Sequence, residues 1–164
     1  MTEAVSSPAE SKNPSAPIAF IERAFGLLEK IPYAILALPL RVAAATVFWR
    51  SGNGKLANWN TTLYLFEEEY KVPLLSPEFA AQMATAVELT APVLLVVGLA
   101  TRVSAGVLLG MTAVIQIFVY SMSWPTHIQW AAILLVILAR GPGMISIDHL
   151  VKTKVAPMLG FKNI

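Results

Sequence analysis

Two residues of opposite charge interrupt the apolar segments of this chain and are the first candidates for chemistry. Arg41 lies near the middle of the apolar segment 31–51, and Glu88 lies near the middle of the segment 77–99. A single charge of this kind at the bilayer centre costs about 2.5–3.5 kcal/mol, so intramembrane charges usually pair and face other helices. Antiparallel neighbouring helices would bring the two side chains to the same depth. We therefore predict an Arg41–Glu88 ion pair inside a helical bundle.

Backbone and amide groups near these charges extend the predicted cluster. Pro39 and Pro92 each remove a helical hydrogen bond, which frees a carbonyl near each charge and offers Arg41 further acceptors. Gln116, in the next apolar segment, is the third predicted member. The cluster has two interpretations: it fixes the register of the helices, or it binds a polar head group such as a quinone or relays a proton. The sequence leaves both interpretations open, together with the protonation of Glu88.

His127 is a further candidate, at the outer turn between the third and fourth apolar segments, where the fourth segment begins. Imidazole titrates near neutral pH, so this side chain would suit a proton donor to a bound quinone. The alternative is an interfacial histidine among the aromatic residues that line membrane surfaces. Met122 and His127 together could bind a soft metal such as Cu(I), but two ligands without a thiolate make a weak site, and we predict no metal centre. The candidate quinone or proton site thus comprises Arg41, Glu88, Gln116 and His127, with no catalytic residue assigned.

The composition indicates that these candidate residues lie in a membrane protein. Of the 164 residues, 56% are hydrophobic and 13% are charged, and the mean hydropathy is +0.64. These values are far from those of ordinary soluble domains. The apolar segments are 31–51, 77–99, 103–123 and 125–140, and the first three reach the roughly 20 residues that cross a bilayer. We expect an all-α integral membrane protein with a bundle of four transmembrane helices.

The absence of cysteine and the distribution of charge narrow the chemistry further. Without cysteine, disulfides, thiolate metal sites and electron transfer through thiols are excluded within the chain. The net charge of +2 arises from basic residues that lie mostly outside the apolar segments, so we expect no nucleic-acid partner. Lys and Arg are more frequent on the side of the two termini than in the first loop. Both termini are therefore predicted to be cytoplasmic.

The flanking segments differ from the predicted bundle. Residues 1–17 are rich in Ser, Pro and Ala, which predicts a disordered cytoplasmic tail without a signal peptide. Residues 18–30 alternate apolar and charged residues at helical spacing, which predicts an amphipathic helix on the membrane surface. The membrane domain is expected over 31–150, and a basic cytoplasmic tail over 151–164.

The first loop contains a second amphipathic pattern. Apolar residues recur there at spacings of three and four, at Leu56, Trp59, Leu63, Phe66 and Tyr70. This pattern predicts a helix that lies over the outer face of the bundle. The helix either closes the loop or acts as a lid over a binding site.

Beyond the last apolar segment, the sequence ARGPGMISIDHL ends the span with Gly and Pro. Ser146 is placed to cap a short helix that contains Asp148 and His149. This segment is either a simple terminator or an exposed docking surface beside the basic tail.

Several motifs, taken in order, resemble the DoxX family of small four-span membrane proteins. They are RVAAATVFWRSGNGKLANW, EEEYKVPLLSPEFAA, TAVELTAPVLLVVGLATRVSA and HIQWAAILLVILARGPGMISID, and the resemblance extends over residues 38–150. It implies a four-helix membrane bundle. The recurring polar residues carried over by position are Arg41, Lys55, Glu88, Arg102, His127 and Asp148.

The functional implication of this resemblance is broad. The family is named for a subunit associated with thiosulfate:quinone oxidoreductase, and relatives are connected with quinone-linked oxidation, stress responses and membrane anchoring of enzymes. We expect an accessory subunit of a redox or stress-response system in a bacterial inner membrane, with quinone as the candidate cofactor and an oxidoreductase or stress-operon product as the partner. The alternatives are a non-catalytic anchor or assembly factor for metal-handling or peptide-modifying proteins, and a small transport helper. Catalytic activity and homo-oligomerisation are left open.

Overall fold

A computed structural model of the chain describes residues 16–155 and 158. Almost all of the predicted disordered tail and much of the predicted basic tail therefore lie outside the described residues, as residues 1–15, 156–157 and 159–164. The chain divides into two units, one that ends at Pro32 and one that begins at Tyr33.

Helix α1 (Ala16–Glu29) occupies the first unit, where the amphipathic surface helix was expected. Its apolar side chains Ile18, Ile21, Phe25 and Leu28 are all at least half exposed. An exposed apolar face opposite charged residues is typical of a helix that lies in a membrane surface. The placement of α1 on the membrane stays a prediction.

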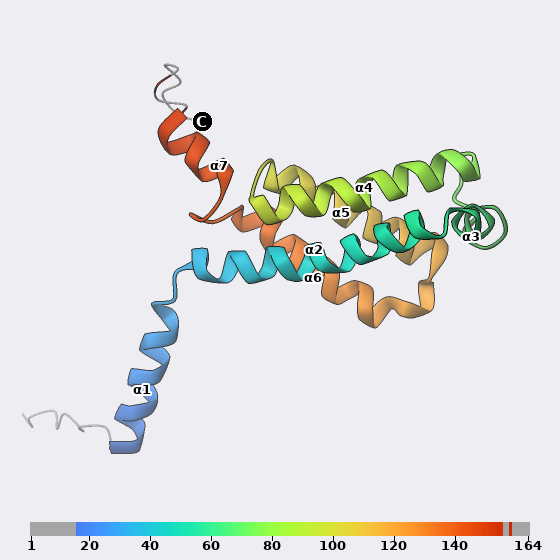
Figure 1. The fold of residues 1–164 in the computed structure, drawn as a ribbon. Coiled ribbons are helices and arrows are strands. Elements are labelled where there is room, and N and C mark those ends of the chain that lie inside the picture. Colours follow the sequence, from blue (N-terminus) through green and yellow to red (C-terminus); the bar gives the residue numbers. More distant parts are fainter. Residues whose placement is uncertain (1–15, 156–157, 159–164) are drawn as a thin grey trace, which may run out of the picture. The chain divides into compact units, whose positions relative to one another are not determined.

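The second unit contains four long helical segments that lie side by side (Figure 1). They are α2 (Tyr33–Ala57), α4 (Pro77–Val97), α5 (Thr101–Val114) with its π-helical continuation η2 (Ile115–Val119), and the 3-10 turn η3 (Ser121–Ser123) with α6 (Trp124–Arg140). Each of the four is long and apolar enough to cross a membrane. The predicted all-α, four-span fold is confirmed for the described part of the chain.

The helices pack in a ring in which α2 contacts α4, α4 contacts α5, α5 contacts α6, and α6 returns to α2. Each helix contributes two residues to the central core, which consists of Ala44, Phe48, Ala91, Leu95, Ala105, Leu108, Leu134 and Ile137. Alanines on α2, α4 and α5 allow the backbones to approach closely, as is common where helices pack in membranes. Many larger apolar side chains are exposed instead, which suits contact with lipid.

Helix α2 is longer than the first predicted span. It continues through a polar stretch to Ala57, whereas the apolar pattern ended at residue 51. Gly52 packs within this extension against α4, where a Cβ atom would lie 2.9 Å from the Cβ of Glu88. Packing of this kind holds the last turns of α2 in helical form, although their composition is polar.

The first loop forms α3 (Trp59–Tyr64) and the π-helix η1 (Leu65–Tyr70). Their apolar residues pack against the start of α4 in a small cluster of Trp59, Leu63, Phe66, Tyr70, Val72, Ala80, Ala81 and Ala84. Leu56 was predicted to belong to this face, but it lies in α2 and is exposed. We call this end of the bundle the loop end.

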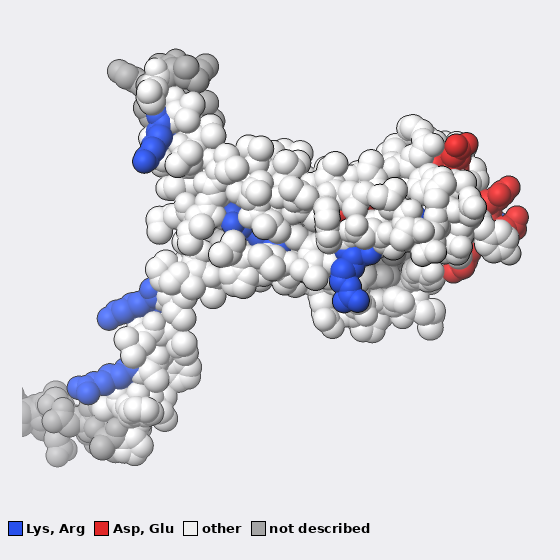
Figure 2. All heavy atoms as spheres, in the orientation of Figure 1, with Lys and Arg blue, Asp and Glu red and all other residues white. Residues whose placement is uncertain are grey.

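Acidic side chains gather at the loop end, over α3 and its continuation (Figure 2). Glu67, Glu68 and Glu69 follow one another in η1 and are all exposed. Leu74, in the connection to α4, is fully exposed and has a positive φ of 71°. The loop end thus presents both acidic and apolar groups to its surroundings.

The opposite end, which we call the turn end, carries the short turn between α4 and α5 and the segment after α6. Ser146 caps α7 (Ile147–Leu150) as predicted, since its Oγ accepts a hydrogen bond from the His149 amide at 3.1 Å. The π-helix η4 (Val151–Val155) follows.

Asp148 also belongs to the turn end. Its carboxylate accepts hydrogen bonds from the amides of Ala100 and Thr101, both at 2.8 Å, and so caps the start of α5. Of the two interpretations of this segment, the docking surface would have needed an exposed carboxylate, whereas Asp148 is half-buried and engaged within the fold.

Candidate ligand-binding site

Arg41 is buried at the turn end and does not pair with Glu88. Its guanidinium donates from Nη1 to the carbonyl of Pro142 at 3.0 Å and from Nη2 to the carbonyl of Ile145 at 2.8 Å. A Cβ atom added at Gly98 would collide with Arg41 Nη1, so the α4–α5 turn packs directly on the guanidinium. Arg41 thereby joins α2 to the segment that follows α6.

Two predictions about Arg41 are therefore wrong. The carbonyls that it uses do not come from the interruptions at Pro39 and Pro92 but from the turn after α6. The predicted ion pair does not form, because α2 is longer than the predicted span and Arg41 is therefore not at its middle. Arg41 is the ninth of the 25 residues of α2, whereas Glu88 is the twelfth of the 21 residues of α4. Glu88 lies beside Gly52, and the eleven residues from Arg41 to Gly52 correspond to about 16 Å along a helix.

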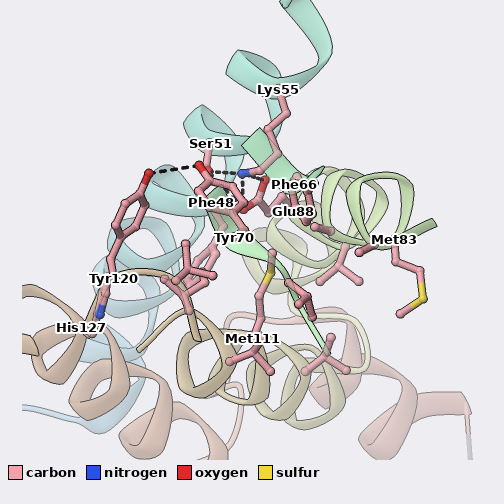
Figure 3. A pocket seen from close by; sticks show the side chains of 18 of the residues that line it. Phe48, Ser51, Lys55, Phe66, Tyr70, Met83, Glu88, Met111, Tyr120 and His127 are labelled. Carbon is pink, nitrogen blue, oxygen red and sulfur yellow. Dashed lines mark hydrogen bonds and ion pairs between the residues drawn. The ribbon is translucent and has the colours of Figure 1, made fainter. Parts of the chain in front are cut away.

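The partner of Glu88 is Lys55, from the last turn of α2. Lys55 Nζ donates to Oε1 and Oε2 of Glu88 at 2.9 and 2.8 Å and to Ser51 Oγ at 2.8 Å, and Ser51 Oγ donates to Oε1 at 3.1 Å (Figure 3). The side chains of Lys55 and Glu88 are 18% and 1% exposed. An ion pair buried in a membrane span is costly and is by default a candidate functional group.

Sequence reasoning placed Lys55 among the recurring family residues but left it and Ser51 out of the candidate site. Ser51 is the last residue of the apolar segment that defined the first span, and Lys55 follows that segment in a stretch that looked like loop. Their spacing of four would place them on one helix face. That signal becomes informative only if α2 is known to continue beyond residue 51.

A cavity of about 410 Å³ lies beside the Lys55–Glu88 pair. Its polar lining residues are Ser51, Lys55, Tyr70, Glu88, Tyr120 and His127, and the remaining lining is apolar, with Phe48, Met83, Met111 and Trp130 among the large side chains (Figure 3). Two of the three π-helical segments in the described part of the chain, η1 and η2, contribute to the wall, and π-helical turns are frequent at functional sites. We call this space the loop-end cavity.

Two tyrosines from different segments meet at the loop-end cavity. The Tyr120 hydroxyl donates to the Tyr70 hydroxyl at 3.2 Å, and their rings pack edge to face with centroids 5.6 Å apart. Burial raises the pKa of Tyr70 above its ordinary value, so Tyr70 stays protonated at neutral pH. Whichever hydroxyl donates, one O–H hydrogen of the pair has no partner among the described residues and is available to a ligand.

Gln116 orients His127 instead of joining an arginine cluster. Gln116 Nε2 donates to the carbonyl of Ser121 at 2.8 Å, so its Oε1 accepts the hydrogen of His127 Nδ1 at 2.7 Å. In the neutral ring, Nε2 then carries a lone pair that no other described residue engages. The imidazole packs on Trp130 with ring centroids 5.0 Å apart. Gln116 is thus a positioning residue, while His127 offers an acceptor.

The structure separates the sequence-predicted residues into two groups. Glu88 and His127 line the loop-end cavity, and Gln116 contacts His127 behind it. Arg41 lies at the turn end together with Arg102, whose Nη2 donates to the carbonyl of Ala139 at 3.3 Å. Among the described residues, no three His, Cys, Asp or Glu side chains come together as they would around a metal ion.

The chemistry of the loop-end cavity follows from these groups. A tyrosine pair supplies a donor, a histidine supplies an acceptor, and the only formal charges in the lining belong to an ion pair that compensates itself. Apolar walls surround these groups within a membrane-spanning bundle. Such a site can hold an amphipathic molecule by its hydrogen-bonding head.

The fold and the site define a multi-pass membrane protein whose helical bundle contains an amphipathic cavity. A family model described as DoxX matches residues 36–121, slightly more than half of the chain, and the chain therefore belongs to the DoxX family. The matched region contains Lys55, Glu88 and Gln116 but ends before His127. Comparisons with curated proteins and with solved structures gave no match.

Proposed function

We propose that this DoxX protein is an accessory subunit of a redox or stress-response system in a bacterial inner membrane, and that its loop-end cavity binds a quinone. The observation that carries the proposal is the cavity itself, which combines apolar walls with a tyrosine donor and a histidine acceptor. The carbonyls of a quinone accept hydrogen bonds, and the hydroxyls of a quinol also donate them. A site with both a donor and an acceptor suits either form.

The size of the cavity supports this ligand class. Small-molecule sites commonly measure about 300–1,000 Å³ and are mostly apolar with a few placed polar groups. The loop-end cavity, at about 410 Å³, would hold a quinone ring and the first part of its tail. The remaining tail would lie in the bilayer.

A binding measurement tests the proposal. The full chain, reconstituted in lipid nanodiscs, is titrated with decylubiquinone while tryptophan fluorescence is recorded, because Trp130 lines the cavity. We expect saturable quenching. Tyr70→Phe should weaken the affinity about two- to tenfold, since a hydrogen bond contributes about 0.5–1.5 kcal/mol.

Tyr64→Phe is the matched control, because Tyr64 lies one and a half helical turns earlier, is exposed and is absent from the cavity lining. It should bind decylubiquinone like the natural chain. Quenching that never saturates, or that is the same in both variants and in the natural chain, would show that the quinone merely dissolves in the lipid, and the quinone proposal would fail.

A second candidate function, a non-catalytic anchor for partner proteins, is supported by the loop end. There the fully exposed Leu74 lies a few residues from three consecutive exposed glutamates. Mass spectrometry of the protein purified gently from its native membrane distinguishes the two. A stoichiometric oxidoreductase or retained quinone supports the redox subunit, and recovery of metal-handling or peptide-modifying proteins alone supports the anchor.

A further inference from the structure

We propose that the loop-end cavity selects amphiphiles with an uncharged head group that arrive from the bilayer, and that the Lys55–Glu88 pair sets this selectivity. The inference deepens the proposed function, because it concerns the same cavity. It does not require the head group to be a quinone.

The charges in the lining of the loop-end cavity compensate each other. The residues with formal charge in the lining are Lys55 and Glu88, and each is the counterion of the other at 2.8 Å. A charged head group that entered would have no counterion of its own in a largely apolar space, which is strongly unfavourable. The lining is therefore matched to a neutral ligand.

The hydrogen-bonding groups of the Lys55–Glu88 pair are already engaged within the protein. The three hydrogens of Lys55 Nζ are directed to Ser51 Oγ and to the two carboxylate oxygens of Glu88, and both of those oxygens accept from Lys55. An anionic head group could reach the ammonium only by displacing Glu88, and a cationic one could reach the carboxylate only by displacing Lys55. Neutral donors and acceptors remain available at the tyrosine pair and at His127.

The outer wall of the cavity indicates the route of arrival. Met83 on α4, with Val107 and Val114 on α5, line the cavity and are also 45%, 43% and 39% exposed on membrane-spanning helices. These apolar side chains border the cavity where the bundle meets lipid. The polar lining groups lie toward the loop end, at the end of α2, in η1 and just after η2. A ligand would thus place its head toward the loop end and its tail toward the bilayer.

Three probes with one brominated dodecyl chain test this selectivity, with a hydroxyl, a sulfonate or a trimethylammonium head. Bromine quenches nearby tryptophan, so binding in nanodiscs is read as the part of the quenching that Trp130→Phe removes. In the natural chain we expect the hydroxyl probe to bind at least about tenfold more tightly than either charged probe. Similar affinities for all three probes would overturn the proposal.

Variants of the pair should change the selectivity in opposite directions. Glu88→Gln leaves an unpaired ammonium and should raise the affinity for the sulfonate probe at least about tenfold, whereas Lys55→Met leaves an unpaired carboxyl and should favour the trimethylammonium probe. The double variant Lys55→Met with Glu88→Gln restores a neutral lining and should again prefer the hydroxyl probe. Single variants that both shift toward the same charged probe would contradict the assigned roles.

The outcomes separate this inference from the quinone proposal. If the hydroxyl probe binds selectively and decylubiquinone does not bind, the quinone proposal fails and the selectivity stands. If neither these probes nor decylubiquinone binds in the natural chain, both fail; if decylubiquinone alone binds, the quinone proposal stands and the selectivity for uncharged head groups in general fails. If a single variant does not fold, as judged by circular dichroism and gel filtration, the natural chain and the double variant still decide, since strong binding of a charged probe by either one overturns the proposal.

Discussion

Arg41 and Glu88 are both buried charges in membrane-spanning helices, but their surroundings give them different roles. Arg41 donates hydrogen bonds to backbone carbonyls at the turn end, and no ion pair among the described residues includes it. Glu88 is paired with Lys55 and borders a cavity. The first arrangement stabilises a connection between segments, and the second places a mutually compensated ion pair in the wall of a cavity.

The structural role of Arg41 leads to a stability prediction. Arg41→Met leaves the carbonyls of Pro142 and Ile145 without their donors, and a buried unpaired group costs about 1–3 kcal/mol. We expect the free energy of unfolding to fall by at least that amount, measured by denaturant titration in mixed micelles. Arg50→Met is the control, because Arg50 is an exposed arginine of the same helix. Equal losses in the two variants would contradict the role assigned to Arg41.

Double-mutant cycles at the residue scale distinguish the observed ion pair from the predicted one. Lys55→Met and Glu88→Gln should couple by about 0.5–3 kcal/mol, because the two side chains share hydrogen bonds. Arg41→Met and Glu88→Gln should be additive within about 0.5 kcal/mol, because they lie at different heights in the bundle. A clear coupling between Arg41 and Glu88 would mean that the two residues interact after all.

At the scale of elements, the contact between α2 and α4 decides where the ion pair forms. Gly52 lies at this contact, where a Cβ atom would be 2.9 Å from Glu88 Cβ and 3.1 Å from the Glu88 carbonyl carbon. Gly54 is in the same helix and has nothing within 4 Å of an added Cβ. The two glycines therefore provide a matched comparison.

Gly52→Ala should separate the two helices and lower the thermal stability, since the clash involves backbone that cannot rotate away. Gly54→Ala should be neutral or slightly stabilising, because alanine favours the helix by about 1 kcal/mol over glycine. Differential scanning fluorimetry in detergent compares them directly. An unchanged melting temperature for Gly52→Ala would show that the α2–α4 contact is looser than the structure indicates.

The whole molecule has an orientation that the charge distribution predicts and that a labelling experiment can test. Because the chain lacks cysteine, single cysteines introduced at exposed Leu74 and Val155 report each side independently. We expect a membrane-impermeant maleimide to label Leu74→Cys in intact spheroplasts, and Val155→Cys only after lysis, since both termini are predicted to be cytoplasmic. The reverse pattern would invert the topology.

The sequence by itself determined the class of the fold. Four apolar segments of membrane-spanning length predicted the four-span bundle, and the spacing of Trp59, Leu63 and Phe66 predicted a helical loop packed by its apolar face. Ser146 was recognised as a helix cap from local pattern alone. These features depend on hydrophobicity and on hydrogen bonds between near neighbours, so a single sequence contains the information.

Only the tertiary structure decided which distant groups meet. The apolar pattern of the sequence predicted an end of the first span that was too early. Apolar periodicity cannot reveal a polar helical turn that is stabilised by packing between Gly52 and Glu88. That difference moved Arg41 away from Glu88 and brought Lys55 to it. Pairings of this kind depend on the relative heights of packed helices. Those heights are set by close contacts and helix lengths across the whole bundle, and residue spacing along one chain does not specify them.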